Sequence, residues 1–173
     1  MKIVLLGYMG SGKSAVGNSL ATTLKWPIVD LDTRIEEKAE MSISQIFDRK
    51  GEIYFRKLER ATLQEVLSQE QSLVLATGGG TPCYGDNLQL LNESEAVITV
   101  FLKTKIPTLM ARLKPEASQR PLIAHLDSDE ALVEFIGKHL FERNKFYQQA
   151  DYTIDTDDKT PQHIVEEIVL PLF

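Results

Sequence analysis

The sequence predicts one three-layer α/β/α domain in which helices cover both faces of a parallel β-sheet. The chain has 173 residues, which suits one domain of ordinary size. Short continuous apolar runs alternate with helix-length amphipathic segments, as expected of parallel strands that are buried on both faces. A Gly-rich turn directly follows the first apolar run, and ligands of such sheets gather beyond the carboxyl ends of the strands.

The five expected strands are the short apolar runs of the chain. They lie at residues 2–6, 27–30, 72–76, 96–102 and 152–155. Helical patterns fill the segments between them, from residue 13 to 25, from the second strand through Glu40, and at residues 44–47, 52–67, 106–113, 129–149 and 161–170. Pro161 falls in the first turn of the last helix, where proline is well tolerated. Two prolines and several polar residues predict a loop at residues 114–126.

Composition and charge exclude several classes of protein. Hydrophobic residues make up 43% and charged residues 25% of the chain, as in a folded globular domain. No apolar run approaches the roughly 20 residues that a membrane helix needs. The net charge of −6 disfavours a nucleic-acid surface, because phosphate backbones bind basic faces.

The start of the chain and its cysteine content bear on location. Met1 and Lys2 lead directly into a strand, so we expect no signal peptide. Cys83 has no partner for an intrachain disulfide, which suits a reducing compartment. We therefore expect a cytoplasmic protein, a monomer, that binds neither nucleic acid nor a membrane.

The Gly-rich turn carries the strongest single signal. Residues 7–14 read Gly-Tyr-Met-Gly-Ser-Gly-Lys-Ser and match the pattern G-x-x-x-x-G-K-[ST] between a strand and a helix. The glycines let backbone N–H groups converge on phosphate oxygens, and the helix N-terminus adds partial positive charge. Lys13 is expected to reach the β- and γ-phosphates of a nucleoside triphosphate, and the Ser14 hydroxyl to ligate Mg²⁺. The expected nucleotide contacts in this phosphate loop are Gly10, Ser11, Gly12, Lys13, Ser14 and Ala15.

The same loop occurs in GTPase switches and in ATP-driven motors, so other motifs must decide the reaction class. A GTPase normally carries N-K-x-D, whereas residues 144–147 read Asn-Lys-Phe-Tyr and lack the aspartate. Residues 48–51 fit D-x-x-G, but no strand precedes them. No apolar strand ends in Asp-Glu, as the strands of motors often do. These absences favour a kinase that acts on a small molecule.

Two carboxylates follow the second strand in an Asp-Leu-Asp sequence. Strand alternation places Asp30 and Asp32 on the same side, near the phosphate loop. Asp30 is suited to Mg²⁺, and Asp32 to the acceptor hydroxyl, whose proton it could take. Alternatively, one of them only caps the helix that begins near Thr33, and this alternative applies more to Asp32 than to Asp30.

Three glycines and three arginines complete the expected acceptor site. The glycines follow the third strand and let a ligand approach the main chain closely; they are Gly78, Gly79 and Gly80. An arginine binds a carboxylate through two parallel hydrogen bonds. The arginines with a suitable sequence context are Arg56, Arg120 and Arg143. The competing interpretations are a tight turn without a ligand and arginines that are solvated at the surface.

Taken together, these motifs resemble the shikimate kinase family. Besides the phosphate loop, the matching sequences are Asp-Leu-Asp at 30–32, Phe-Arg at 55–56, Thr-Gly-Gly-Gly at 77–80, Arg-Pro-Leu at 120–122 and Arg-x-x-x-Tyr at 143–147. They occur in the order and spacing of the family and span nearly the whole chain. Each short motif is weak apart from the phosphate loop, and the ordered set is what is specific.

The resemblance implies one P-loop kinase domain, residues 1–173, with a five-stranded parallel sheet of order 2-3-1-4-5. It implies a helical substrate-binding segment near residues 33–61 and a lid near residues 112–125. The implied reaction uses ATP and Mg²⁺ to convert shikimate into 3-phosphoshikimate, on the route to aromatic amino acids.

The resemblance also implies roles for single residues. The implied shikimate contacts are Asp32, Arg56, Gly79 and Arg143, with Phe47 and Phe55 as aromatic pocket walls and Glu59 as a support of the arginine. Arg120 would contact the phosphates of ATP from the lid, and Arg112 would lie beside the adenine. A lid that closes excludes water and so favours the hydroxyl as acceptor.

The sequence departs from the family pattern in two places, and two other functions are compatible with the phosphate loop. Ala150 follows Tyr147 after three residues instead of four, and residues 114–118 match no lid motif. A gluconate-type or nucleoside monophosphate kinase could use the same phosphate loop, although a nucleotide kinase would need several arginines for a second phosphate group. A non-catalytic ATP-binding regulator would not need a carboxylate on the acceptor side.

Overall fold

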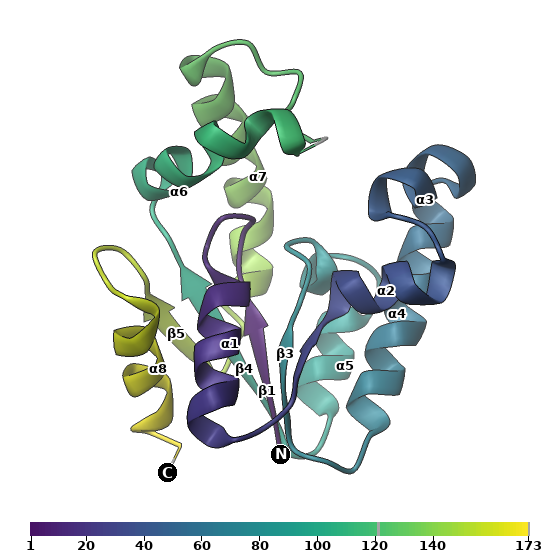
Figure 1. The fold of residues 1–173 in the computed structure, drawn as a ribbon, viewed down its shortest axis with the longest axis vertical. Helices are drawn as coiled ribbons and strands as arrows, with labels where there is room; N and C mark the ends of the chain where they lie inside the picture. The colour runs from purple at the N-terminus through teal and green to yellow at the C-terminus, as the bar shows by residue number, and fades with distance from the viewer. Residues whose placement is uncertain (121, 173) are drawn as a thin grey trace.

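The computed structural model describes residues 1–120 and 122–172, and its parallel sheet has the order β2-β3-β1-β4-β5 (Figure 1). The strands are β1 (Lys2–Leu6), β2 (Ile28–Asp30), β3 (Leu73–Ala76), β4 (Val97–Lys103) and β5 (Tyr152–Asp155). The α-helices are α1 (Lys13–Leu24), α2 (Leu31–Ala39), α3 (Ile43–Lys50), α4 (Glu52–Ser68), α5 (Asn87–Glu93), α6 (Ile106–Leu113), α7 (Asp129–Tyr147) and α8 (Pro161–Val169). Two 3₁₀ helices are η1 (Thr81–Cys83) and η2 (Lys114–Gln119). The predicted fold class and strand order are confirmed.

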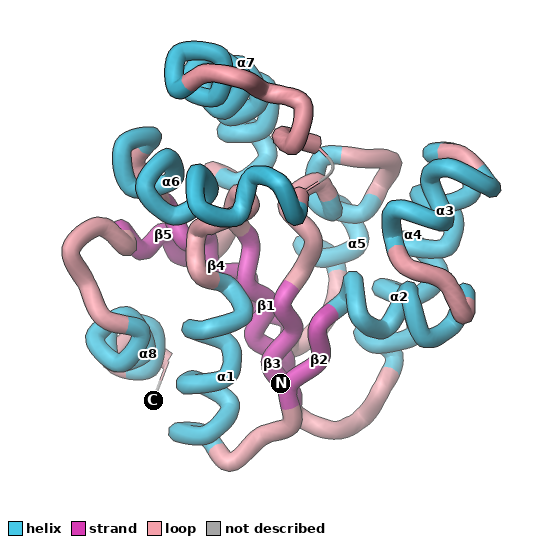
Figure 2. The backbone as a smooth tube through the Cα atoms, turned by 45° about the horizontal axis from the view of Figure 1, so that its top comes forward, coloured by secondary structure: helices cyan, strands magenta, loops and turns pink. Residues whose placement is uncertain are grey.

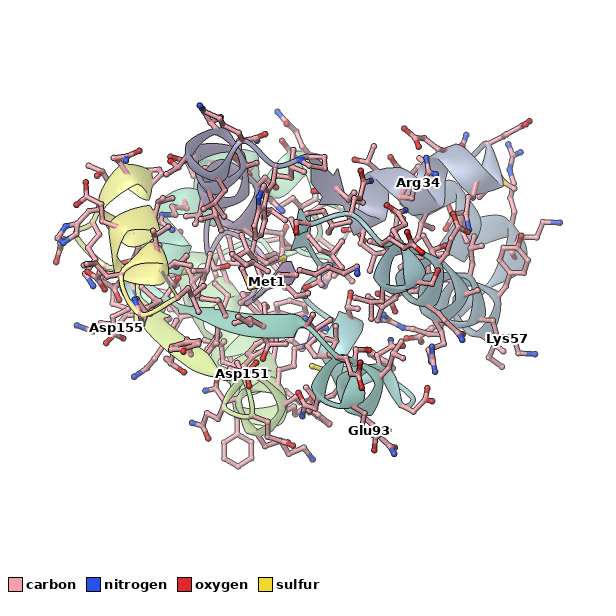
Figure 3. The ribbon with its side chains drawn as sticks, turned by 90° about the horizontal axis from the view of Figure 1, so that it is seen from below. Met1, Arg34, Lys57, Glu93, Asp151 and Asp155 are labelled. Atoms are coloured by element: carbon pink, nitrogen blue, oxygen red, sulfur yellow. The ribbon has the colours of Figure 1, made fainter. Side chains whose placement is uncertain are left out.

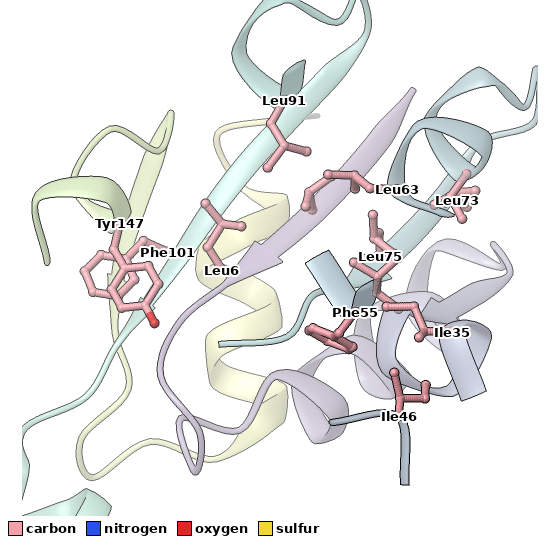
Figure 4. Close-up of a cluster of buried hydrophobic side chains, with 13 residues drawn as sticks. Leu6, Ile35, Ile46, Phe55, Leu63, Leu73, Leu75, Leu91, Phe101 and Tyr147 are labelled. Atoms are coloured by element: carbon pink, nitrogen blue, oxygen red, sulfur yellow. The ribbon is translucent and has the colours of Figure 1, made fainter. Parts of the chain in front are cut away.

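Side-chain alternation along β1 divides the core into two layers. Ile3 and Leu5 pack with apolar residues of α1 and α8 on one face of the sheet. Val4 and Leu6 pack on the other face with residues of α4, α5 and α7 (Figure 4). All four β1 side chains are fully buried. Figure 2 shows the same helices on the two sides of the sheet, which leaves the carboxyl edge of the strands for loops.

The register of the sheet places two loops side by side. β1 pairs with β3 so that Leu5 lies opposite Ala76. Just beyond β3, Thr77 donates to the carbonyl of Leu5 from its backbone N–H at 3.3 Å and from its hydroxyl at 2.9 Å. The phosphate loop after β1 and the glycine triplet after β3 therefore begin as neighbours.

The turn between α3 and α4 sets an aromatic wall. Ser42 and Gln45 form a capping box that fixes the start of α3. Gly51 joins the two helices with a φ of 82°, a conformation that favours glycine. The Phe47 and Phe55 rings consequently face each other with their centroids 4.7 Å apart.

Three parts of the secondary structure differ from the prediction. The short helix α5 has only two turns, too few for its periodicity to predict a helix from the sequence. The expected loop at residues 114–126 begins with η2, because Pro115 stands in the first turn, where no backbone donor is needed. β2 ends at Asp30 and Asp32 lies in α2, so the prediction that strand alternation relates the two carboxylates is wrong.

Charged side chains surround the sheet, as Figure 3 shows from below for Lys57 and Glu93, which are both exposed. Exposed large apolar side chains are scattered over several elements, with Phe141 of α7 the most exposed of those described. Across the described residues, no helix combines the length and the apolar character that crossing a membrane requires.

Candidate active site

Two cavities lie at the carboxyl ends of β1, β2 and β3. The first has a volume of about 620 Å³ and is lined by the phosphate loop, Asp30 and Arg112 among others; we call it the phosphate cavity. The second has a volume of about 500 Å³ and is lined mainly by α2, α3, α4 and the glycine triplet; we call it the acceptor cavity. Residues that line both are Met9, Asp32, Gly78, Gly79 and Arg120. The two cavities therefore meet, as transfer between two bound molecules requires.

The phosphate loop depends on glycines with positive φ. Gly10 and Gly12 have φ values of 79° and 96°, which a side chain would disfavour. The Ser11 backbone N–H donates to the carbonyl of Tyr8 at 3.1 Å and closes the loop. The Ser11 hydroxyl is buried without a hydrogen-bond partner among the described residues. This hydroxyl lies against Gly7, where a Cβ would be 2.7 Å from it, and Ser11 is not among the described residues that line the phosphate cavity.

Lys13 lies across the phosphate loop. Its Nζ donates to the carbonyls of Gly7 at 2.8 Å and Tyr8 at 3.0 Å. Burial lowers the pKa of Lys13 to about 8, although the carboxylates of Asp32 and Asp30 act in the opposite direction. The ammonium group therefore has an environment that a negatively charged phosphate would improve.

Asp30 and Asp32 both line the phosphate cavity but hold different places in the fold. Asp30 is the N-cap residue of α2, and its Oδ1 accepts a hydrogen bond from the Thr33 backbone N–H at 3.1 Å. The capping alternative thus applies to Asp30, and assigning it more to Asp32 is wrong. Burial, with repulsion from Asp30 and Glu59, raises the pKa of Asp32 to about 6. The Asp32 carboxylate can therefore bind a proton only slightly below neutral pH.

Each glycine of the triplet packs against a different part of the site. A Cβ on Gly78 would lie 2.9 Å from Oδ1 of Asp32, and a Cβ on Gly80 would lie 3.3 Å from both Nη atoms of Arg56. A Cβ on Gly79 would lie 3.4 Å from a backbone nitrogen of the phosphate loop. Because these glycines have no side chains, Asp32, the phosphate loop and Arg56 can all pack closely against the triplet.

Arg56 lies on α4 and lines the acceptor cavity together with Phe47 and Phe55. Its Nη1 donates to Oε2 of Glu59 at 2.8 Å. Glu59 is only 1% exposed, and its Oε1 accepts from the Thr81 hydroxyl at 2.8 Å. Glu59 thus contacts the arginine in the way that the resemblance implies.

Arg143 lies on α7 and lines the same cavity. Its Cζ is 5.7 Å from the centroid of the Tyr8 ring in the phosphate loop. The Tyr147 hydroxyl, one turn further along α7, donates to the carbonyl of Gly79 at 2.5 Å. The Tyr147 ring also stacks on Phe101 of β4, with centroids 5.0 Å apart. The early position of Ala150 leaves this part of α7 in place.

The segment expected to form the lid contributes two arginines to the phosphate cavity. Arg112 of α6 donates from Nη1 to the carbonyl of Gly10 at 3.0 Å. Arg120 pairs with Glu116, with Nε at 3.0 Å from Oε2. Pro121 of the Arg-Pro-Leu motif lies outside the described residues.

Sequence reasoning misses part of the acceptor cavity. The additional lining residues are Met9, Thr33, Glu36, Ile43, Gln119 and Leu122. Ile43 lies four residues before Phe47 on α3, and this spacing, which places both on one helix face, is a signal that could have indicated it. Tyr84 is also missed; its ring stacks on Arg56 in a segment that carries no motif.

The residues at the phosphate cavity fit a magnesium ion that is shared with a phosphate ligand. Ser14 and Asp30 both line the cavity. No group of three or more His, Cys, Asp or Glu side chains within the described ranges could hold a metal by itself. Mg²⁺ is commonly held by one or two carboxylates, substrate phosphates and water, so a hydroxyl and a carboxylate beside a phosphate loop suit it.

Comparison with known proteins gives a consistent result. The model of the family described as shikimate kinase matches residues 9–172. A shikimate kinase of Flavobacterium psychrophilum is 45% identical over 172 residues, covering 99% of each chain. The crystal structure of shikimate kinase from Bacteroides thetaiotaomicron superposes with a TM-score of 0.90 at 37% identity, covering 99% of this chain and 98% of that one. The structure of Acinetobacter baumannii shikimate kinase in complex with shikimate has a TM-score of 0.86 at 32% identity, covering 99% of this chain and 92% of that one.

Proposed function

The chain belongs to the shikimate kinase family, and on that basis we propose how its residues transfer the γ-phosphoryl group of ATP to the 3-hydroxyl of shikimate. The products are ADP and 3-phosphoshikimate, on the route to aromatic amino acids. The observation that carries the proposal is the junction of the two cavities at Asp32 and Gly79, with the guanidinium groups of Arg56 and Arg143 in the acceptor cavity.

On the nucleotide side, we assign the triphosphate to the phosphate loop. Backbone N–H groups and the N-terminus of α1 face its oxygens. Lys13 would exchange its loop carbonyls for the β- and γ-phosphates, which favours its charged form. Ser14 and Asp30 would hold Mg²⁺, which neutralises charge on the transferring phosphate.

On the acceptor side, we assign the substrate carboxylate to Arg56 and Arg143. The ring would lie against Phe47 and Phe55, which line the same cavity. Asp32 lies where the two cavities meet, so it would accept a hydrogen bond from the attacking hydroxyl and orient it in line with the γ-phosphate. Because phosphoryl transfer has a loose transition state, this orientation matters more than complete removal of the proton.

We assign a closing lid to residues 112–125. Arg120 lines both cavities from this segment, and among the described residues its side chain forms a surface ion pair with the exposed Glu116, a weak kind of contact. On closure Arg120 would exchange Glu116 for the phosphates of ATP, and the segment would exclude water from the transfer.

A coupled ADP-release assay tests the substrate. The panel contains shikimate, gluconate, nucleoside monophosphates and no acceptor. We expect turnover that depends on shikimate. Turnover with gluconate alone would reject this acceptor, and ATP binding without acceptor-dependent turnover would favour a regulator.

We further propose that the enzyme acts as a cytoplasmic monomer without a nucleic-acid partner. The cytoplasm supplies the ATP that the reaction consumes, and the net charge of −6 disfavours binding to a phosphate backbone. Light scattering on the purified chain, with and without added DNA, measures the oligomeric state and any complex. Cell fractionation measures the location.

A further inference from the structure

The guanidinium group of Arg56 is enclosed on several sides. Its Cζ lies 3.5 Å from the centroid of the Tyr84 ring and 5.0 Å from the centroid of the Phe55 ring. The first distance is that of a cation stacked on an aromatic face. Tyr84 is 36% exposed and is not among the described residues that line the acceptor cavity. It therefore covers the guanidinium from outside the cavity.

A series of contacts begins at Arg56, passes through Glu59 and η1 to Tyr84, and ends again at Arg56. Arg56 donates to Glu59, and Glu59 accepts from Thr81, the first residue of η1. Tyr84 is the C-cap residue that directly follows η1, and its ring packs against Arg56. Glu59 and Thr81 are both buried. The arginine is thus held by a short ion pair with Glu59 at Nη1, by longer contacts with Glu52 at Nε and Nη2, and by a ring over its face.

The segment that carries Tyr84 is itself held in place. Cys83 donates its backbone N–H to the carbonyl of Gly80 at 2.9 Å and so closes the turn before Tyr84. Two residues after Tyr84, Asp86 accepts from Nε and Nη2 of Arg60 at 2.7 and 3.0 Å. Arg60 lies one turn after Arg56 on α4. The backbone on either side of Tyr84 is therefore anchored, before it to the glycine triplet and after it to α4.

Gly80 lies where Tyr84 and Arg56 meet. A Cβ at this position would be 3.2 Å from Cε2 of Tyr84 and 3.3 Å from both Nη atoms of Arg56. We propose that Tyr84 is a positioning residue, which fixes the guanidinium plane of Arg56 so that it receives the planar carboxylate of the acceptor. This inference rests on the proposed function and adds a residue that contacts neither substrate.

The physical reason is preorganisation. An arginine side chain has many rotamers, and binding a carboxylate through two hydrogen bonds requires one plane and one direction. Fixing that plane in advance lowers the entropy lost when the substrate binds. Loss of the ring should therefore weaken acceptor binding and leave the nucleotide side unchanged.

The first test compares Tyr84→Leu with Tyr84→Phe in steady-state kinetics. Leucine removes the aromatic face, and phenylalanine keeps it. We expect Tyr84→Leu to raise KM for shikimate about three- to tenfold, with kcat and KM for ATP within about twofold of the wild type. Tyr84→Phe should behave as the wild type. Tyr54→Leu is the matched control, since Tyr54 is a 41% exposed tyrosine on α4.

The second test is a double-mutant cycle with Arg56→Lys, read as kcat/KM for shikimate. A lysine has no guanidinium plane to fix, so Tyr84→Leu should have little further effect in that background. Equal effects of Tyr84→Leu in both backgrounds would overturn the inference, as would an unchanged KM in the single variant. A wild-type chain without shikimate turnover would reject the proposed function, and this inference with it. Turnover with an additive cycle would reject the inference alone.

Discussion

The carboxylate of Glu52 accepts hydrogen bonds from two nitrogens of Arg56, with Oε1 at 3.4 Å from Nε and 3.5 Å from Nη2. These nitrogens form an edge of the guanidinium that a substrate carboxylate can use. The Glu52 side chain is 54% exposed and both contacts are long, whereas Glu59 is buried and its contact is short. Glu52 is therefore the weaker of the two carboxylate partners, and we expect the acceptor carboxylate to compete with it for Arg56, although Glu52 is not among the described residues that line the acceptor cavity.

The first prediction concerns this competition. Glu52→Gln should lower KM for shikimate by about two- to fivefold, because an exposed ion pair contributes up to about 1 kcal/mol and a negative charge beside an anion is removed. We expect kcat and KM for ATP to stay unchanged in steady-state assays. Glu37→Gln, at an exposed glutamate that pairs with Arg34, is the control. A rise in KM would mean that Glu52 orients Arg56 instead of competing.

The second prediction concerns Asp32 and turnover. Asp32→Asn should reduce kcat by about 100-fold or more, because a neutral amide is a weaker hydrogen-bond acceptor than a carboxylate and orients the attacking hydroxyl poorly, while ATP affinity changes little. In the wild type the rate should fall as the pH drops through about 6, where Asp32 becomes protonated. Rate profiles between pH 5 and 8 measure this. Unchanged turnover in the variant would remove Asp32 from the mechanism.

The third prediction concerns Asp32 and stability. Its folded-state pKa of about 6 lies above the ordinary value of 3.8, so the folded chain binds this proton more tightly than the unfolded chain. Stability is therefore lost as the pH rises through this interval, and the loss is complete at pH 7. Asp32→Asn removes the buried charge and should raise the unfolding midpoint at pH 7 by about 2–4 °C. The gain should vanish near pH 4, and a gain of equal size at both pH values would contradict this cause.

The fourth prediction separates the two substrates. Arg143→Ala should raise KM for shikimate by about tenfold or more, since a charge-assisted hydrogen bond contributes about 1.5–3 kcal/mol. KM for ATP should change little. Arg34→Ala, at an arginine 44% exposed on α2, is the control and should leave both values unchanged. An effect confined to KM for ATP would place Arg143 on the nucleotide side.

The fifth prediction follows from the pKa of Lys13, about 8 in the structure. Bound phosphates favour the ammonium form and raise this pKa, so ATP binding should take up a proton at pH 8.5 and little at pH 6.5. Apparent ATP affinity should accordingly fall as the pH rises above about 8. Calorimetry in buffers of different ionisation enthalpy measures the uptake. Lys13→Met, which cannot take up the proton, should abolish it.

The meeting of the loops could be expected from the sequence, because parallel strands end at one edge of a sheet and motifs follow three of them. The strand order was expected only from the resemblance to the family. Strand alternation failed at Asp32, since the backbone turns into a helix immediately after Asp30. Either Asp30 or Asp32 could have capped the helix, and their spacing in the sequence does not show which one does. The sequence-predicted assignments of site residues to individual ligands remain predictions.

Tyr84 shows what the sequence could not supply, and Ile43 shows what it could supply only in part. Tyr84 reaches Arg56 through the shape of a seven-residue turn after β3, and no periodic pattern encodes that shape. Ile43 is an ordinary apolar residue of an amphipathic helix, and only the placement of α3 over the site turns it into cavity lining. Motifs report residues with unusual chemistry, whereas ordinary residues gain their roles from packing.

The crowding around Gly78 and Gly80 limits how this enzyme could be redesigned for another acceptor. Even a methyl group there would push on Asp32 or Arg56, so enlarging or reshaping the pocket from that side would damage the machinery itself. The part of the cavity lining that α3 supplies, with Ile43 and Phe47, offers apolar side chains that can be exchanged for larger or smaller ones. A directed-evolution library aimed at bulkier polyhydroxy acids would do best to vary that wall and to leave the glycines alone.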